Sequence, residues 1–460
     1  MAESVWAHTM PDADRFTGEP LTAGATADVV IVGGGYTGLW TAYYLTVLDP
    51  TLRVVVLEAE TVGFGASGRN GGWCSGLLPM SLSKLADVHG RYAATAMQRA
   101  MYETVDEVRR VLDLEGIDAA VAKGGTLALA RTPAQERRLR AELAELLRFG
   151  FDERDARWLG AAEAVERCGA SGVLAAVASP HCAALHPLRL MHGIANAANR
   201  RGVVVHEHTP ATGIHPERVE TAAGAIATQV VVLATEAYTS RLPGRKRELL
   251  PVYSLMVATE PLDEGTWRSI GLADRATFTD GRHLIVYGQR TADGRLAFGG
   301  RGAPYHFGSR IAGSFDTDER VRGKLVASAR ELFPTLADAE FPFHWGGPLG
   351  VSRDWHCAVH FDRTSRLAFA GGYAGDGVAT ANLAGRTLAE LITGQEGELC
   401  DLPWVGHHSP VWEHEPWRWL RVNSARVAAG RADRAERSRG PLATRRAAGW
   451  RRALTALSGR

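Results

Sequence analysis

The spacing of apolar residues predicts a strand, a helix and a second strand within the first sixty residues. An apolar run, ADVVIV, ends at Val32, helical spacing follows in TGLWTAYYLTVL, and a second run, RVVVLE, ends at Glu58. Apolar runs of this length fit buried strands, and the segment between them fits a packed helix. The chain is therefore predicted to begin with a Rossmann-like βαβ unit.

The pattern changes twice further along the chain. Helices are predicted over residues 84–116, 133–150 and 188–202, and a hydrophobic strand over 229–239 fits a return to the first sheet. From Leu250 to about Trp345, alternating strands separated by turns predict a mostly antiparallel sheet. The expected fold class is α/β for the nucleotide-binding part, and α+β for the chain as a whole. A Rossmann-like nucleotide-binding domain carries a second, mostly antiparallel-sheet domain over which a substrate lies.

Three glycines occupy the turn between the first strand and its helix, in the spacing Gly33-x-Gly35-x-x-Gly38. In a dinucleotide-binding turn the first glycine allows a sharp bend, and the second lets the backbone approach a pyrophosphate. The third lets helix and strand pack closely. The helix N-terminus favours the negative charge of phosphates. Glu58 follows at about 20 residues, where an acid binds the ribose hydroxyls.

The type of dinucleotide is indicated by the late segment AGGYAGDGV. A flavoprotein that also binds a pyridine nucleotide would carry a second strand–GxGxxG–helix unit. None is present, because Gly299-Gly300-x-Gly302 meets Pro304 instead of a helix. A helix that begins near Gly377 and points at a flavin ring would stabilise the negative charge of the reduced ring. The combination predicts FAD as the cofactor.

Composition sets limits on partners and location. Apolar residues make up 45% and charged residues 22% of the 460, and the formal net charge of +1 gives no reason to expect nucleic acid. No apolar run approaches the roughly 20 residues of a membrane span. Five cysteines without a CxxC pair, and a polar start unlike a signal peptide, favour a cytoplasmic protein.

At these motifs the sequence resembles the D-amino acid oxidase and glycine oxidase superfamily of FAD-dependent oxidoreductases. The resemblance runs from residue 27 to about 400, and GFGASGRNGG with WGG and GYxGxGV is most similar to the γ-glutamylputrescine oxidase-like branch. Members of the family oxidise amines or amino acids. The resemblance implies FAD contacts by Gly33, Gly35, Tyr36, Thr37, Gly38, Glu58, Ala66, Ser67, Arg69, Asn70, Gly71, Gly72, Ala211, Ala234, Thr235, Gly372, Gly375, Asp376, Gly377 and Val378.

The predicted domains are discontinuous. An arm over residues 1–26 precedes an FAD-binding domain of residues 27–80, 160–240 and 350–400, and residues 81–159 and 241–349 form the substrate domain. Residues 401–460, rich in Trp and Arg, are expected to form a helical extension packed on the surface. A membrane or nucleic-acid contact is the less favoured interpretation of that segment.

The sequence departs from the family where substrate and oxygen are handled. Amino-acid oxidases clamp the substrate carboxylate with arginine, because a planar guanidinium matches it bidentately. Leu349, five residues before Asp354, and Gly375 stand at the two corresponding positions, which argues against a simple α-amino acid. Arg301 is the best substitute anion binder, with a structural ion pair as the alternative. Ala297 stands where sarcosine-oxidase-type enzymes place a lysine that helps oxygen react, so a dehydrogenase stays open.

Covalent flavin attachment is a further open point. Gly347 stands where sarcosine oxidases carry the cysteine that binds flavin. Dehydrogenase relatives carry a Trp-His pair in the loop after the second strand, and its histidine is bonded to the flavin ring. Here Trp73-Cys74 follows a similar loop, at a position shifted by two residues from that pair. A cysteinyl–flavin link is one hypothesis for Cys74, and a small buried packing residue is the favoured one.

Other candidate residues carry weaker signals. Tyr253, Tyr287 and Trp345 are predicted to face the flavin, where aromatic walls suit an aliphatic amine, and with Arg301 they are the catalytic candidates. Each aromatic residue fits sheet core equally well. No metal site is predicted, because the histidines show no ligand spacing with cysteine or carboxylate.

These observations lead to a functional hypothesis. It is oxidation of the C–N bond of an amine or modified amino acid to an imine, with reoxidation by O2 to H2O2. Three alternatives stay open. They are a dehydrogenase that acts on a C–O bond or passes electrons to another acceptor, a flavin monooxygenase, and a non-catalytic flavin-binding protein.

Overall fold

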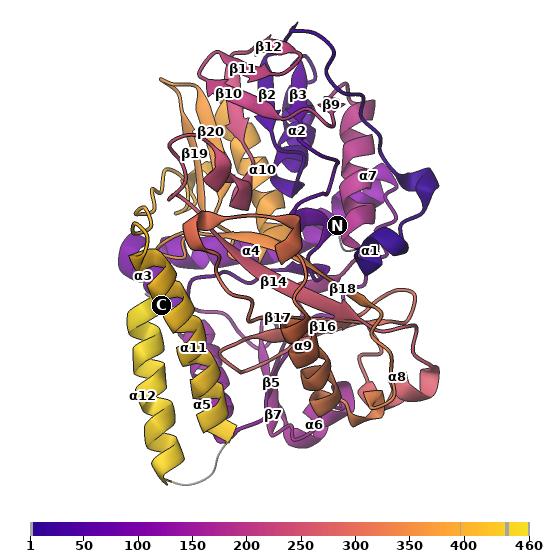
Figure 1. Cartoon of the computed structure of the whole chain (residues 1–460), viewed down its shortest axis with the longest axis vertical. Helices are drawn as coiled ribbons and strands as arrows, with labels where there is room; N and C mark the ends of the chain where they lie inside the picture. The colour runs from indigo at the N-terminus through magenta and orange to yellow at the C-terminus, as the bar shows by residue number, and fades with distance from the viewer. Residues whose placement is uncertain (1–2, 396, 438–440, 459–460) are drawn as a thin grey trace.

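The computed structural model describes residues 3–395, 397–437 and 441–458, and its two large sheets lie in two lobes (Figure 1). The predicted βαβ unit forms the centre of a six-stranded sheet. β2 pairs in parallel with β3 and with β13, so the chain returns to the first sheet as predicted. The spatial order is β19 (Ala358–Asp362), β20 (Leu367–Gly371), β13 (Val230–Leu233), β2 (Val29–Val32), β3 (Val54–Leu57) and β9 (Val204–His206).

Both faces of this sheet are buried. Val29 and Ile31 of β2 pack among helices, whereas Val30 and Val32 face a small four-stranded sheet. Burial on both sides explains why these strands are apolar throughout. The covering elements are α2 (Tyr36–Leu48), α4 (Arg91–Glu115), α7 (Pro187–Arg200) and α10 (Gly377–Thr393) on one face, and β1 (Ala25–Thr26), β12 (Gly224–Ala227), β11 (Arg218–Thr221) and β10 (Ala211–His215) on the other.

The second lobe is an eight-stranded sheet. β15 and β5 pair in parallel and the other neighbours are antiparallel, which confirms the predicted mostly antiparallel sheet. Helix α9 (Glu319–Leu332) packs on one face of it. The strand order is β18 (Phe343–Val351), β14 (Leu250–Ala258), β17 (Leu296–Arg301), β16 (Val286–Arg290), β15 (Thr277–Asp280), β5 (Thr126–Ala130), β7 (Ala175–Ser179) and β6 (Arg157–Gly160).

Two segments differ from the sequence-based expectation. The helix expected over 84–116 is two helices, α3 (Leu82–His89) and α4, separated by Gly90 with a φ of +86°. Residues 157–179 contain β6, helix α6 (Ala161–Arg167) and β7. Both strands pair within the eight-stranded sheet, although 160–240 is assigned above to the FAD-binding domain. The partner of a short strand depends on tertiary pairing rather than on its own pattern. The domain division stays a prediction, and this pairing favours a boundary near residue 181.

The amino-terminal arm is hydrogen-bonded to the six-stranded lobe. After the short helix α1 (Val5–His8), the Phe16 N–H donates to His192 Nδ1 (3.0 Å) and the Gly18 N–H donates to Glu207 Oε2 (2.8 Å). The small antiparallel pair β4 (Trp73–Ser75) and β8 (Cys182–Ala184) lies next to the glycine-rich loop of residues 63–72, which has the sequence GFGASGRNGG.

The chain ends in two long helices, α11 (Trp417–Arg437) and α12 (Pro441–Ser458), which lie beside α5 (Pro133–Arg148) in Figure 1. Asp433 of α11 accepts the backbone N–H groups of His283 and Leu284, at 2.7 and 3.0 Å. The C-terminal helices therefore pack on the eight-stranded lobe. In the part of the chain that the structure describes, every helix falls short of the length or apolar character that crossing a membrane requires.

Close packing of α10 on α2 depends on Gly385. A Cβ at this position would lie 2.7 Å from the Cβ of Trp40 and 2.8 Å from the backbone nitrogen of Thr41. We expect Gly385→Ala to lower the thermal unfolding midpoint, because overpacking of about 1–3 kcal/mol outweighs the ~1 kcal/mol that alanine normally gains over glycine in a helix.

Gly323→Ala is the matched control for this prediction. Gly323 lies in α9, where an added Cβ would meet nothing within 4 Å. This variant should keep or raise the unfolding midpoint measured by scanning calorimetry. Equal midpoints for the two variants would contradict the role of Gly385.

Candidate functional site

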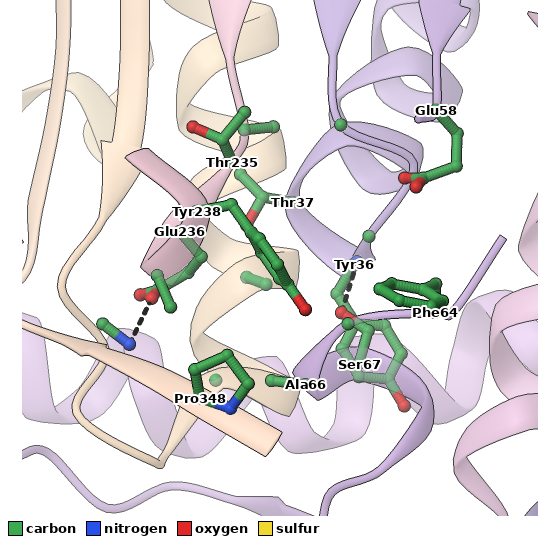
Figure 2. A pocket seen from close by; sticks show the side chains of 18 of the residues that line it. Tyr36, Thr37, Glu58, Phe64, Ala66, Ser67, Thr235, Glu236, Tyr238 and Pro348 are labelled. Atoms are coloured by element: carbon green, nitrogen blue, oxygen red, sulfur yellow. Dashed lines mark hydrogen bonds between the residues drawn. The ribbon is translucent and has the colours of Figure 1, made fainter. Parts of the chain in front are cut away.

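A cavity of about 320 Å³ opens where β2, β3 and β13 end, at the N-terminus of α2. This edge of a parallel sheet is where open α/β folds bind their ligands. Figure 2 shows Glu58 at one end of the cavity, Ala66 and Pro348 at the other, and the Tyr238 ring between them. Of the predicted FAD contacts, the cavity is lined by Gly33, Gly35, Tyr36, Thr37, Glu58, Ala66, Ser67, Asn70, Ala211, Ala234, Thr235, Gly375, Gly377 and Val378.

The glycine turn has the shape that its spacing indicates. Gly33 has a φ of +113°, and a Cβ there would lie 2.5 Å from the carbonyl oxygen of Ala234. A Cβ on Gly38 would overlap the carbonyl oxygen of Gly33, so the third glycine permits helix packing and lies outside the cavity wall. At the helix N-terminus the Tyr36 N–H donates to Ser67 Oγ (3.0 Å; Figure 2).

Glu58 is held by backbone donors at the end of β3. The N–H groups of Gly34 and Glu60 donate to its two carboxylate oxygens, at 2.7 and 3.0 Å. Burial raises the pKa of Glu58, and these two hydrogen bonds oppose that shift. A helix N-terminus, a wall without Cβ atoms and an acid beyond the second strand fit a pyrophosphate and a ribose. The residues present therefore fit FAD.

A second cavity of about 360 Å³ continues from the first. It lies along the face of the eight-stranded sheet that carries Ser254, Thr279 and Tyr287, so one predicted catalytic residue lines it. The predicted FAD contacts Arg69, Gly71 and Asp376 belong to this cavity. The residues common to both cavities are Ala66, Asn70, Leu349, Gly375 and Val378.

Arg69 is neutralised within the cavity wall. Its Nη1 donates to Asp316 Oδ2 (2.7 Å) and to the Gly346 carbonyl (3.2 Å), and its guanidinium carbon lies 4.8 Å from the centroid of the Phe64 ring. Burial raises the pKa of Asp316, and the charge of Arg69 opposes that shift. A substrate carboxylate would have to compete with Asp316 for this cation.

Two predicted catalytic aromatics, Tyr253 and Trp345, line neither cavity, which disfavours the prediction that they face the flavin. Side chains alternate across a strand, so Tyr253 lies on the opposite face of β14 from Ser254, and its hydroxyl donates to the Ala312 carbonyl (3.3 Å). Trp345 is buried behind the glycine-rich loop, where its Nε1 donates to the Arg69 carbonyl (3.0 Å). Both residues shape the site indirectly.

Two more predicted residues, Gly72 and Gly372, line neither cavity. Gly72 donates its N–H to Asn70 Oδ1 (2.8 Å) and shapes the loop, and Gly372 lies in the turn after β20. Arg301 ends β17, where its backbone is paired with that of Ser254. The side chain of Arg301 lies outside the part that the structure describes.

Cys74 lies in β4 and packs in the helix-covered core. It is buried and lines neither cavity, although its neighbour Trp73 lines the second one. Burial raises the pKa of the Cys74 thiol, which disfavours the reactive thiolate. These observations favour the packing role of Cys74 over a link to the flavin.

Glu236 is a site residue that sequence reasoning missed. It follows Thr235 at the start of a 3-10 helix, η3 (Glu236–Arg241), with a φ of +43°. Its carboxylate accepts the N–H groups of Gly350 (2.7 Å; Figure 2), Gly372 (2.9 Å) and Tyr373 (3.1 Å). A charged residue directly after the apolar run VVVLAT was the available signal.

Three histidines that are distant in the sequence come together. His89, His356 and His407 offer nitrogen atoms within 4.8 Å of one another. The rings of His356 and His407 stack with centroids 3.8 Å apart and 20° between their planes, so their in-plane lone pairs do not converge on one ion. His407 Nε2 instead pairs with Asp354 Oδ2 (2.8 Å). We interpret the cluster as a hydrogen-bonded network.

The sheet topology and the two joined cavities define the class of the protein as a two-lobed flavoprotein. Comparison of sequences identifies the family, because the model of the family described as FAD dependent oxidoreductase matches residues 28–391. The chain belongs to this family, and its cofactor is FAD. The family resemblance stated from the motifs is thereby confirmed.

Individual relatives agree with this assignment. The chain is 31% identical over 385 residues to gamma-glutamylputrescine oxidoreductase of Escherichia coli (strain K12), which covers 82% of this chain and 86% of the relative. It is 30% identical over 397 residues to the probable oxidoreductase OrdL of Haemophilus influenzae, with 83% and 86% covered. The crystal structure of glycine oxidase from Geobacillus kaustophilus superposes with a TM-score of 0.70 at 22% identity, covering 83% of this chain and 99% of that one.

Glu236 leads to a prediction about the protein prepared without FAD. Burial raises the pKa of its carboxyl from 4.5 to about 7, against the three N–H donors. Between these values the folded state holds a proton that the unfolded state has lost. The raised pKa of Glu236 therefore adds up to about 3 kcal/mol to the unfolding free energy. This stabilisation is fully present below about pH 4.5 and is lost as the pH rises through about 7.

The measurement is urea unfolding of the wild type and of Glu236→Gln between about pH 5 and pH 8. The difference in unfolding free energy, wild type minus variant, should decrease as the pH rises, since only the wild type titrates at this position. A difference that is constant across this range would show that Glu236 is ionised throughout.

Proposed function

We propose that the protein oxidises the C–N bond of an amine or modified amino acid to an imine, with O2 as electron acceptor and H2O2 as product. The observation that carries the proposal is that the nucleotide cavity and a second, partly apolar cavity share wall residues, among them Leu349, Gly375 and Val378. Bound FAD supplies the acceptor for the hydrogen and the electron pair of the C–H bond. A cytoplasmic location is part of the same proposal.

The second cavity suits an uncharged aliphatic segment next to a reacting nitrogen. Leu78 and Ile285 contribute apolar wall, and Trp73 packs edge to face on Tyr287 with ring centroids 5.7 Å apart. Such walls exclude water and hold a substrate in one orientation. The Tyr287 hydroxyl lies 3.2 Å from Ser254 Oγ, and this pair can hydrogen-bond an amine nitrogen.

The cavity is poorly suited to a simple α-amino acid. Among its described lining side chains Arg69 is the cationic one, and it is paired with Asp316. Leu349 lies where the two cavities meet, at the position where amino-acid oxidases of the family are expected to carry arginine. Without a free guanidinium among the described lining side chains, a substrate carboxylate would be desolvated and left unpaired there.

The electron acceptor has a specific alternative. Ala297, at the expected position of an oxygen-activating lysine, is buried in β17 and lines neither cavity. In the described chain, the linings of both cavities also lack lysine. This favours testing a dye or protein acceptor beside O2.

The proposed function predicts that amines bleach the bound flavin in the absence of air. The panel contains primary and secondary amines, α-amino acids, hydroxy-phosphates and NADPH, and absorbance follows flavin reduction. Amines should reduce the flavin fastest, and admission of air should return one H2O2 per flavin. Reduction by hydroxy-phosphates alone, or by NADPH alone, would replace the proposal with the C–O dehydrogenase or the monooxygenase, respectively.

Leu349→Arg tests the reason for the proposed preference. The new guanidinium would supply the missing carboxylate partner, so kcat/KM for a small α-amino acid should rise at least about tenfold while that for a monoamine falls. Leu349→Met preserves volume and charge and should leave the order of substrates unchanged. An arginine variant with unaltered preference would mean that residue 349 does not face the substrate.

A further inference from the structure

The second cavity is bounded on one side by an acidic side chain from α5. Glu142 lies in the middle of this helix and lines the cavity, with its side chain exposed rather than packed. Within the described residues it has no hydrogen-bonded or ion-paired partner. Its carboxylate is thus available to a ligand in the cavity.

The nearest cation on the same helix is already engaged. Arg138, one turn before Glu142, donates from both terminal nitrogens to the carboxylate of Glu436 in α11, at 2.8 and 2.9 Å. Glu436 also lies 3.1 Å from His283 Nε2. Because this carboxylate is shared and buried, Arg138 is held toward α11. Glu142 lies within the influence of its charge but forms no salt bridge with it.

The strand order places Glu142 far from the junction of the two cavities. The junction lies at Leu349 on β18, whereas the cavity continues past Tyr287 on β16 to Thr279 on β15. Four strand spacings of about 4.8 Å separate β18 from β15, roughly 19 Å in all. Helix α5 lies beyond β15, since a Cβ on Gly281 would lie 2.9 Å from the Cβ of Gln135.

The charges in the cavity wall favour a cation. Among the described lining residues, Glu142 contributes a carboxylate without a salt-bridge partner, Asp376 a second carboxylate, and Arg69 is offset by Asp316. Leu78 and Ile285 line the same cavity and match an aliphatic chain. A second positive group on the substrate would therefore gain attraction at the α5 side, whereas a carboxylate there would be repelled.

We propose that Glu142 binds a second ammonium group of the substrate, and that the substrate class is an aliphatic diamine or polyamine. The inference rests on the proposed C–N oxidation and specifies its substrate. The amine at one end of the substrate lies next to the flavin and is oxidised. The ammonium at the other end binds Glu142, so the preferred substrates are those with the matching separation between their two nitrogens. Glu142 is thus a specificity-determining residue rather than a catalytic one.

The test compares two amines of equal chain length, 1,12-diaminododecane and 1-aminododecane, with the FAD-loaded full chain, because only a long chain can span most of the roughly 19 Å between the cavity junction and α5. The wild type should show the higher kcat/KM for the diamine. Glu142→Gln should lower kcat/KM for the diamine at least about fivefold, mainly through KM, and change that for the monoamine less than about twofold. Glu142→Lys should additionally raise kcat/KM for 12-aminododecanoate.

Glu136→Gln is the matched control, because Glu136 is on the same helix and pairs with Arg140 outside the cavity. It should leave both amines unchanged. Equal losses for both amines in Glu142→Gln, or a wild-type preference for the monoamine, would overturn the role of Glu142 while C–N oxidation stands. A wild type that no amine reduces would overturn the proposed function, and this inference with it.

Discussion

Backbone segments from both sheets meet at the buried carboxylate of Glu236. It lies directly after β13 of the six-stranded sheet and accepts the N–H of Gly350 from β18 of the eight-stranded sheet. It also accepts the N–H groups of Gly372 and Tyr373, which begin the turn into α10. Unpaired buried N–H groups are costly, so these contacts fix where the two lobes meet. Both cavities lie beside this junction, and their shared wall depends on it.

A second connection between the lobes is the glycine-rich loop. On one side Ser67 accepts the N–H of Tyr36 at the dinucleotide turn. On the other side Gln289 of β16 donates to the Gly71 carbonyl (2.6 Å), and Trp345 donates to the Arg69 carbonyl. The nucleotide side of the site is thus built largely from backbone and glycine, and the substrate side from side chains. Substrate preference can therefore change through single side chains while the cofactor site is kept.

The C-terminal helices contribute to the second cavity although they lie outside the matched family region. Glu436 of α11 holds Arg138, and Asp433 holds the backbone at His283 and Leu284, next to the lining residue Ile285. These contacts support one wall and pair a cation of α5 with Glu436, so that it forms no salt bridge with Glu142. The arginine-rich segment thus has a structural role in the charge of the cavity.

The βαβ unit, its glycine turn and Glu58 were predictable, because they depend on residues within about thirty positions of one another. FAD was predictable because a second short motif, AGGYAGDGV, is also a local signal. Helix and strand periods are local properties, so most elements were found as well. The exclusion of Tyr253 from the cavity depends on which face of β14 packs on α9, and the position of β7 depends on its pairing with β5. Glu142 and Glu236 gain their roles from segments more than a hundred residues away along the chain. Register and packing between such segments are collective outcomes of the folded core, and no short window of residues encodes them.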